Sequence, residues 1–464
     1  MVYNINILKS FLRKIIPQAA INLGFHLPKA FFASLYYRFP ARKLKIIGVT
    51  GTDGKTTTVN LIYHILNFAG KKAGVVSTVS TKIGQEEIDI GFHVTAPDPR
   101  LLQKLLREMV DEKIEYAVLE ATSHGLDQNR LFGLNFEIGV ITNITREHLD
   151  YHKTYENYLK AKAKLLYASK LTVLNKDDQS YNNLKLKIKN LKLITYGIKN
   201  KADFTPEAFP FKTLLPGEYN QYNCLAAIAV ASQLGISQKT IQEAVASFEG
   251  VTGRMEPVNE GQDFKVIIDF AHTPNALEEV LKTLRSQKPA RQASPACKRL
   301  ALSGRPGEAG GSKVPLRPRS EASKSQKSRL IVVFGAAGLR DQGKRPIMGE
   351  IACRLADLVV LTAEDPRTED VNDIINQIAG GCEGVGARLA EVGESRRGIE
   401  GKTYFKIPDR QEAINLAIQK LAKKGDTVII CGKGHEKSMC FGEVEYPWLD
   451  QEAVKKSLRE RRPA

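Results

Sequence analysis

The chain of 464 residues is long enough for two or three domains with hydrophobic cores. Its hydrophobic content of 42% and charged content of 26% are ordinary for a globular protein. The formal net charge of +17 would suit a nucleic-acid-binding protein, but eleven Lys and Arg against two Asp and Glu lie in residues 286–329. That segment has five prolines and no aromatic residue, so we expect a disordered basic insertion and no nucleic-acid surface.

The six cysteines form no CxxC pair and have no histidine at metal-ligand spacing. They stand at positions 224, 297, 353, 382, 431 and 440. This pattern is typical of reduced, unreactive thiols, so we expect a cytoplasmic protein. A monomer is the working expectation, since no sequence feature determines the oligomeric state.

Residues 1–43 form a short apolar and basic segment before the first predicted domain. Cations at positions 9, 13, 14, 29 and 38 interrupt its apolar runs, so no stretch reaches the roughly 18 residues of a membrane span. No small-residue cleavage site of a signal peptide follows. The aromatic and basic residues at 25–43 also suit a membrane interface, but we favour helices that pack on the next domain.

The sequence IIGVTGTDGKTTT at 46–58 predicts a turn that binds anions between a buried strand and a helix. Gly51 and Gly54 let a phosphate approach the backbone, Lys55 supplies a charge, and Thr56 offers a hydroxyl to Mg²⁺. The strict P-loop pattern fails at Val49, so a plain glycine-rich turn is the alternative. The predicted nucleotide-binding residues are Gly51, Thr52, Asp53, Gly54, Lys55, Thr56 and Thr57.

Residues 44–252 are predicted to form one α/β domain, with strands near 45–49, 116–120, 138–142 and 171–175. Ligands bind at the carboxyl ends of parallel strands, and Glu120 ends a strand beside the phosphate turn. Its carboxylate suits Mg²⁺, and a cap on the next helix is the alternative. His148 follows another strand end, where it can converge with Glu120 on a metal.

Several motifs in this domain resemble the Mur ligase superfamily, most closely its MurE type, which adds the third residue of the peptidoglycan stem peptide. They are TGTDGKTT at 50–57, EATSHGLDQNR at 120–130, NITREHLDYH at 143–152 and YxxxKxxLL at 158–166. Asp53 stands where the family usually has Asn. The resemblance implies ATP and Mg²⁺ as cofactors, and a carbamylated lysine that aligns with Lys162 and holds a second Mg²⁺.

The resemblance also implies roles for other residues of this domain. Glu120, His148 and Lys162 would belong to the metal site with Thr56. The muramoyl-dipeptide would contact Thr95, Ala96, Thr122, Gln128 and Arg130, and Ala96 replaces a threonine that is typical of the family. Asn223 would lie near the adenine, and a role as a helix N-cap is its alternative.

Residues 253–464 are predicted to form a second, Rossmann-like α/β domain. The sequences GRME at 253–256 and DFAHTP at 269–274 resemble the hinge and ribose-side motifs of the family. Arg254, Asp269 and His272 would then touch the nucleotide when the two domains close. No glycine cluster fits the GxGxxG pattern after a strand, so a dinucleotide site is unsupported.

Arg340, Arg367 and Glu436 each follow a predicted strand end, on one rim of the second domain. Two guanidinium groups suit a carboxylate and one carboxylate suits an ammonium, as the distal centre of meso-diaminopimelate requires. An Arg that ends the family motif DNPR marks diaminopimelate enzymes, and this chain has EDPR. Surface ion pairs are the alternative. The predicted amino-acid contacts are Arg340, Glu364, Asp365, Pro366, Arg367, Gly432 and Glu436.

The resemblance thus predicts an ATP-dependent ligase that adds diaminopimelate to UDP-N-acetylmuramoyl-L-alanyl-D-glutamate through an acyl phosphate. Typical members carry about a hundred residues before the P-loop, as a domain that holds the uridine diphosphate, whereas some forty-four precede it here. A reduced anchor or a different substrate is therefore expected. The alternatives are a lysine-adding ligase, a folylpolyglutamate synthase-like ligase, and an inactive, membrane-associated binding protein.

Overall fold

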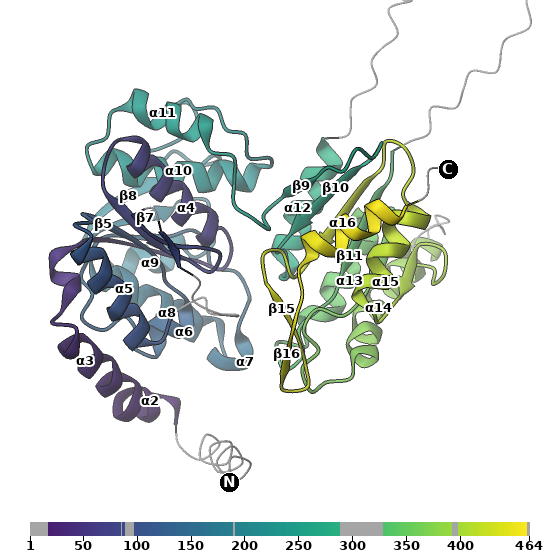
Figure 1. Ribbon diagram of the computed structural model, residues 1–464, viewed down its shortest axis with the longest axis horizontal. Coiled ribbons are helices and arrows are strands. Elements are labelled where there is room, and N and C mark those ends of the chain that lie inside the picture. Colours follow the sequence, from purple (N-terminus) through teal and green to yellow (C-terminus); the bar gives the residue numbers. More distant parts are fainter. Residues whose placement is uncertain are drawn as a thin grey trace, which may run out of the picture.

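The computed structural model describes residues 17–84, 86–88, 97–188, 191–287, 328–391 and 398–461. Two α/β units lie next to each other, each built around its own sheet (Figure 1). The predicted fold class, a mostly parallel sheet domain followed by a Rossmann-like domain, is confirmed. Of the sequence predictions, those for Thr95, Ala96 and residues 288–327 lie outside the described residues.

The central domain has an eight-stranded sheet in the order β4-β3-β2-β5-β1-β6-β7-β8. Six strands are parallel, and β3 and β4 add an antiparallel edge. The strands are β1 (Lys45–Thr50), β2 (Ala73–Val76), β3 (Thr81–Ile83), β4 (Glu86–Ile88), β5 (Tyr116–Glu120), β6 (Phe136–Ile141), β7 (Ser169–Asn175) and β8 (Lys192–Tyr196). The inner strands are apolar on both sides because helices cover both faces of the sheet.

One face of this sheet is covered by α4 (Lys55–Phe68), α10 (Glu218–Gln233) and α11 (Gln238–Ser247). The other face packs against α5 (Pro99–Asp111) and α8 (Tyr155–Tyr167), while α6 (Ser123–Asp127), α7 (Leu149–His152) and α9 (Tyr181–Lys187) are short connections. Strand β1 lies in the middle, so the turn after it opens at the carboxyl edge between its neighbours β5 and β6.

The C-terminal domain has a six-stranded sheet in the order β13-β12-β11-β14-β10-β9, in which only β9 runs antiparallel to its neighbour. The strands are β9 (Glu256–Val258), β10 (Lys265–Asp269), β11 (Leu330–Phe334), β12 (Leu358–Leu361), β13 (Tyr404–Lys406) and β14 (Thr427–Cys431). Helices α12 (Pro274–Ser286), α13 (Lys344–Leu355) and α14 (Val371–Glu391) cover one face. The other face packs against α15 (Arg410–Asn415), a π-helix (Leu416–Leu421) and α16 (Asp450–Glu460), and a hairpin of β15 (Ser438–Phe441) and β16 (Val444–Pro447) follows β14.

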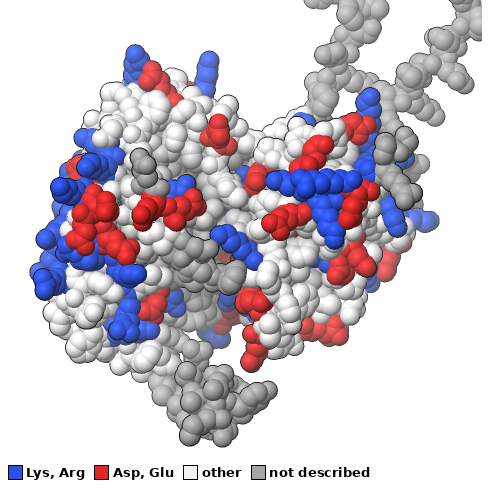
Figure 2. Space-filling model, viewed as in Figure 1, with Lys and Arg blue, Asp and Glu red and all other residues white. Residues whose placement is uncertain are grey.

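The N-terminal segment folds into α2 (Gln18–Ile21), a π-helical turn (Asn22–His26), α3 (Leu27–Tyr36) and a 3₁₀ turn (Pro40–Lys43). These elements follow the outer edge of the central domain (Figure 1), as the favoured interpretation of this segment predicted. Within the described part of the chain, no helix is long and apolar enough to cross a bilayer. Acidic and basic side chains are interspersed over both domains on the face shown in Figure 2.

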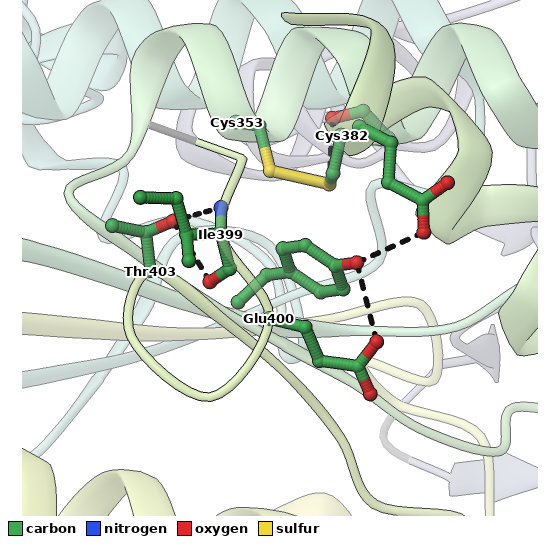
Figure 3. Close-up of a disulfide and its surroundings, with 8 residues drawn as sticks. Cys353, Cys382, Ile399, Glu400 and Thr403 are labelled. Atoms are coloured by element: carbon green, nitrogen blue, oxygen red, sulfur yellow. Dashed lines mark hydrogen bonds between the residues drawn. A yellow bond between two sulfur atoms is a disulfide. The ribbon is translucent and has the colours of Figure 1, made fainter. Parts of the chain in front are cut away.

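One expectation about cysteine chemistry is wrong, because Cys353 and Cys382 form a disulfide between α13 and α14 (Figure 3). The reason is the close approach of these two helices. A Cβ atom on Gly349 would lie 1.9 Å from the carbonyl oxygen of Ile378, and one on Gly381 would lie 1.9 Å from that of Pro346. Cys224, Cys431 and Cys440 are buried free thiols as expected, and Cys297 lies outside the described residues.

Candidate active site

The P-loop runs from the end of β1 to the first turn of α4 and is held by contacts that only glycine permits. A Cβ on Gly51 would lie 1.8 Å from Thr142 Oγ1, and one on Gly54, where φ is +80°, would lie 2.2 Å from Asn223 Oδ1. Lys55 Nζ donates to the carbonyl of Thr52 at 2.8 Å, which folds the ammonium over the loop. The loop therefore presents backbone N–H groups and one cation at a helix N-terminus, as an anion site requires.

Glu120 faces the P-loop and does not cap a helix. Its Oε2 accepts hydrogen bonds from Thr56 Oγ1 at 3.0 Å and from the backbone N–H of Thr78 at 3.1 Å. The next helix, α6, is capped by the side chain of Thr122, so the alternative role of Glu120 as a cap is wrong.

A carboxylate and a hydroxyl beside a phosphate loop are the donors that Mg²⁺ takes when phosphate oxygens and water complete its shell. Thr56 and Glu120 meet this requirement, because their oxygen atoms lie 3.0 Å apart at the phosphate turn. The part of the chain that the structure describes has no group of three His, Cys, Asp or Glu side chains able to hold a metal. A metal ion at this place would thus depend on bound phosphate.

Lys162 is the most deeply buried cation near the loop. Its Nζ donates to the carbonyl of Gly51 at 2.6 Å and lies 4.6 Å from the ring centroid of Tyr158. Burial, and then the nearby charge of Lys55, lower the pKa of Lys162 well below its ordinary value. The lowered pKa favours the neutral amine form of this side chain.

His148 lies beside this lysine, in a cluster of aromatic rings. Its ring centroid is 4.9 Å from that of His124 and 6.1 Å from that of Tyr158. Burial lowers the pKa of His148 well below its ordinary value, and the charges of Lys162 and Lys55 act in the same direction. A neutral imidazole is the form that ligates a metal or accepts a proton.

The predicted muramoyl-dipeptide contacts are only partly brought to this site. Thr122 and Arg130 line the same cavity as the P-loop, whereas Gln128 does not and instead accepts two hydrogen bonds from Arg130, at 2.7 and 2.9 Å. Thr95 and Ala96 lie outside the described residues.

Asn223 lies five residues inside α10, so the alternative that it caps this helix is wrong. Its amide packs against Gly54 and donates to Asn220 Oδ1 at 3.0 Å. The side chain is buried and lines the cavity, so it can contact a nucleotide bound there.

Three predicted nucleotide contacts of the C-terminal domain reach the same cavity. Arg254 stacks on Phe270 and places Nη2 at 3.4 Å from Thr56 Oγ1 across the domain boundary. Asp269, at the end of β10, accepts from the backbone N–H groups of Met255 and Ala271, both at 2.7 Å. Burial and the charge of Lys344 lower the pKa of His272 to about 3.

Arg340 and Arg367 lie close enough for the charge of Arg367 to act on Arg340. Burial, followed by the charge of Arg367, lowers the pKa of Arg340. The guanidinium of Arg367 donates through Nη1 to the carbonyl of Gly338 at 3.2 Å, and its backbone N–H donates to the carbonyl of Cys440 at 3.0 Å. Two like charges held together on a cavity wall favour an anion between them.

The carboxylates of the same rim differ in their surroundings. Glu364 is buried, its Oε2 has no hydrogen-bond partner among the described residues, and burial raises the pKa of this group to about 7. Asp365 accepts from Lys433 Nζ at 2.9 Å, and Glu436 pairs with the same ammonium at 2.5 Å. Gly432 packs on the Glu364 carboxylate, but neither it nor Pro366 lines the cavity.

Apart from Gln128, Pro366, Gly432 and Lys433, the groups described above line one cavity of about 800 Å³ between the two domains. Besides the approach of Arg254 to Thr56, two further contacts join the domains across it. Asp53 accepts from Asn275 Nδ2 at 2.8 Å and from Thr273 Oγ1 at 3.2 Å. Lys344 reaches Glu147 at 3.5 Å and the carbonyl of His272 at 2.9 Å, and both side chains of this ion pair are buried.

Sequence reasoning missed three of these groups. Lys433 stands in the GKGHE motif and Lys344 in the turn GLRDQGKRP, yet a lysine beside glycine gives no sign that it will be fully buried. Asn275 pairs with a residue 222 positions away, which no local pattern reveals. Only their position in these two motifs could have marked the two lysines as candidate site residues.

Comparison with protein families gives two matches. The Mur ligase middle domain matches residues 49–231, and the Mur ligase glutamate ligase domain matches residues 253–302 and 319–434.

Among curated proteins, the chain is 35% identical to UDP-N-acetylmuramoyl-L-alanyl-D-glutamate--2,6-diaminopimelate ligase 1 of Clostridium acetobutylicum, over 92% of this chain and 80% of the relative. It is 36% identical to the ligase of that name from Geobacillus thermodenitrificans, over 93% and 82%. It is also 35% identical to the UDP-N-acetylmuramyl-tripeptide synthetase of a Roseiflexus species, over 92% and 81%.

Solved structures give the same assignment. A UDP-N-acetylmuramoyl-L-alanyl-D-glutamate--2,6-diaminopimelate ligase is similar with a TM-score of 0.55 at 28% identity, over 95% of this chain and 83% of that one. The folylpolyglutamate synthase of Mycobacterium tuberculosis has a TM-score of 0.60 at 14% identity, over 94% and 96%, a likeness of fold alone. With both domain models and relatives above 30% identity in agreement, the chain belongs to the Mur ligase family.

Proposed function

We propose that this protein is an ATP-dependent, ADP-forming ligase that joins meso-diaminopimelate to UDP-N-acetylmuramoyl-L-alanyl-D-glutamate in peptidoglycan precursor synthesis. The observation that carries the proposal is that Arg340, Arg367, Glu364 and Glu436 line the same cavity as the P-loop. Relatives with this activity in their names are 35–36% identical over most of the chain. Because ATP is a reactant, we also propose that the enzyme works in the cytoplasm.

The first step is phosphoryl transfer. An oxygen of the D-glutamate side-chain carboxylate attacks the γ-phosphorus of ATP, the bond to the β–γ bridging oxygen breaks, and ADP leaves. The P-loop N–H groups and Lys55 stabilise the charge on the transferred group, and Arg254 reaches the loop from the other domain. Thr56 and Glu120 would hold Mg²⁺, which would supply positive charge to the phosphates.

The second step is aminolysis of the acyl phosphate. The neutral amine of diaminopimelate attacks the acyl carbon, a C–N bond forms, and inorganic phosphate leaves with the C–O bonding electrons while the amine loses a proton. The charged residues at the rim of the second domain would orient diaminopimelate for this attack. The two guanidinium groups would hold the distal carboxylate, and Glu436 with Glu364 the distal ammonium.

We propose further that Lys162 is carbamylated. A neutral amine adds to CO₂ to give a carbamate and one proton, and the lowered pKa of Lys162 supplies that neutral amine. The product would place an anion beside the ammonium of Lys55, which gives an attraction where a protonated Lys162 would be repelled. It would also offer oxygen ligands next to His148.

Phosphate release in the presence of the muramoyl-dipeptide nucleotide tests the proposal, with diaminopimelate, L-lysine, or a folate with glutamate offered in parallel. We expect turnover with diaminopimelate, and a loss of about 10-fold or more in kcat/KM for it in Arg367→Ala, since a charged hydrogen bond contributes about 1.5–3 kcal/mol. Arg354→Ala, an exposed arginine of the same domain, is the matched control. Equal turnover with lysine would refute the diaminopimelate assignment, and turnover with folate alone would refute the muropeptide branch.

A further inference from the structure

Helix α3 is packed with its small residues inward and its large apolar residues outward. Ala30, Ala33 and Ser34 are buried, and Ser34 Oγ donates to the carbonyl of Phe132 at 3.3 Å, so this face rests on the central domain. The opposite face carries Phe32, Leu35 and Tyr36, which are 64%, 50% and 77% exposed. A helix that only completes a globular core shows the reverse pattern.

This exposed face is part of a wider concentration of apolar surface. Sixteen large hydrophobic side chains are exposed in the described part of the chain, and six of them lie between residues 23 and 36. Leu23 is 69% and Phe25 60% exposed in the π-helical turn before α3. Isolated exposed apolar residues are normal, whereas such a cluster marks an interaction surface.

Charge indicates which kind of partner the surface fits. Residues 1–44 contain seven Lys and Arg and no Asp or Glu. Arg38, Arg42 and Lys43 are exposed and follow α3 directly in the chain. A second copy of the chain would bring equal positive charges together, so an isologous contact is disfavoured.

We propose that residues 17–43 bind the protein to the surface of an anionic bilayer, with α3 lying in the headgroup region. Aromatic side chains prefer that region, and the flanking cations gain from negatively charged lipid. No helix among the described residues crosses a bilayer, so the contact is peripheral. Phe25, His26 and Lys29 of the same segment also line the cavity between the domains, so binding would place the mouth of the site next to the membrane.

Sedimentation with vesicles tests this proposal on the full chain. The probes are vesicles of phosphatidylcholine alone and of phosphatidylcholine with 30% phosphatidylglycerol, at about 0.05 and 0.5 M salt. We expect binding to the anionic vesicles only, and a decrease at the higher salt concentration. No binding to anionic vesicles at low salt, or equal binding to both kinds, would overturn the proposal.

Two triple variants distinguish binding through this surface from nonspecific hydrophobic adsorption to the vesicles. The test variant is Leu23→Ser, Phe32→Ser, Tyr36→Ser, none of which lines the cavity. The control is Tyr167→Ser, Leu186→Ser, Leu214→Ser, whose side chains are 57–66% exposed elsewhere on the same domain. We expect the test variant to lose about 10-fold or more of its vesicle affinity at an unchanged melting temperature, and the control to bind like the parent.

Equal loss in both variants would overturn the assignment of the surface. Light scattering after gel filtration tests whether the partner of this surface is a second copy of the chain. A wild-type dimer that the test variant converts to a monomer, without vesicle binding by either, would show that α3 joins two copies of the chain and would also overturn the proposal.

Discussion

At the scale of single residues, the site contains ionisable groups whose pKa values are displaced by burial. Lys162, His148 and Glu364 each have a pKa displaced by burial, in the direction that favours the neutral form. Groups of this kind occur where proton transfer or unusual ligation takes place. Two of them lead to measurable consequences.

Replacing Lys162 tests the proposed carbamate. We expect Lys162→Ala to lower turnover by about 10²-fold or more, because the anionic oxygen ligand that would hold Mg²⁺ beside the reacting phosphates would be lost. Removal of bicarbonate should slow the parent enzyme, and its return should restore the parent but not the variant. Lys160→Ala, an exposed neighbour on α8, is the control. Bicarbonate-independent kinetics in the parent would refute the carbamate.

The buried carboxyl of Glu364 predicts a pH dependence of stability. Its pKa is raised in the folded protein, so the unfolded state releases this proton first, and the stabilisation present below about pH 4.5 is lost as the pH rises to about 7. Relative to Glu364→Gln, the parent should lose up to about 3 kcal/mol of unfolding free energy between pH 5 and pH 8, by urea denaturation. A constant difference across that range would show that the carboxyl titrates normally.

At the scale of elements, the pairing of α13 with α14 shows how glycine sets the distance between two helices. Gly349 and Gly381 let backbone atoms meet that any side chain would separate. That approach brings the Cα atoms of Cys353 and Cys382 to 5.3 Å, within bonding range of a disulfide. The disulfide is thus a product of the glycine contact.

A pair of alanine substitutions in α14 tests this packing. In Gly381→Ala the new methyl group would lie 1.9 Å from one backbone oxygen and 2.8 Å from a backbone nitrogen. We expect a loss of about 1–3 kcal/mol or more in unfolding free energy. Gly380→Ala, next to it on the same helix with nothing within 4 Å, should gain about 0.5–1 kcal/mol. Similar changes in both would contradict the close contact.

The elements were largely predictable, and their mutual contacts were not. The P-loop strand and helix, the strand that ends at Glu120, and helix α8 follow from apolar runs and periodicity, which act locally. The antiparallel edge strands β3 and β4 are three residues long and give too little pattern to detect. The disulfide joins residues 29 apart without any spacing motif, because its cause lies in glycine packing.

At the scale of the whole molecule, the active cavity exists only because two domains meet. The carboxyl edge of the central sheet supplies the proposed phosphate site, and that of the second sheet supplies the residues that we propose for the amino acid. Sequence motifs predicted both halves but not the contacts that join them. Asp53 to Asn275 and Glu147 to Lys344 are pairs separated by about two hundred residues.

The contact between Asp53 and Asn275 predicts an energetic coupling across the cleft. We expect Asp53→Asn and Asn275→Ala each to lower kcat/KM for ATP several-fold, and the double variant to show a coupling of about 0.5–3 kcal/mol in a double-mutant cycle. Asn275→Ala removes the bond that holds the P-loop to the second domain, and Asp53→Asn replaces its charged acceptor with a weaker amide oxygen. Lys239→Ala, an exposed side chain of the central domain, should combine additively with Asp53→Asn. Additive effects of Asp53 and Asn275 would show that their bond does not matter for the reaction.

Gly253, at the crossing between the domains, has a φ of +70° and leaves no room for a side chain, since a Cβ would lie 2.3 Å from the backbone nitrogen of His435. The residue that links the two domains is therefore in direct contact with the turn that bears Glu436. A rotation of one domain about Gly253 would shift this carboxylate, for which we propose a contact with the distal ammonium of the amino acid. On that proposal, amino-acid binding and the relative orientation of the domains are thermodynamically linked.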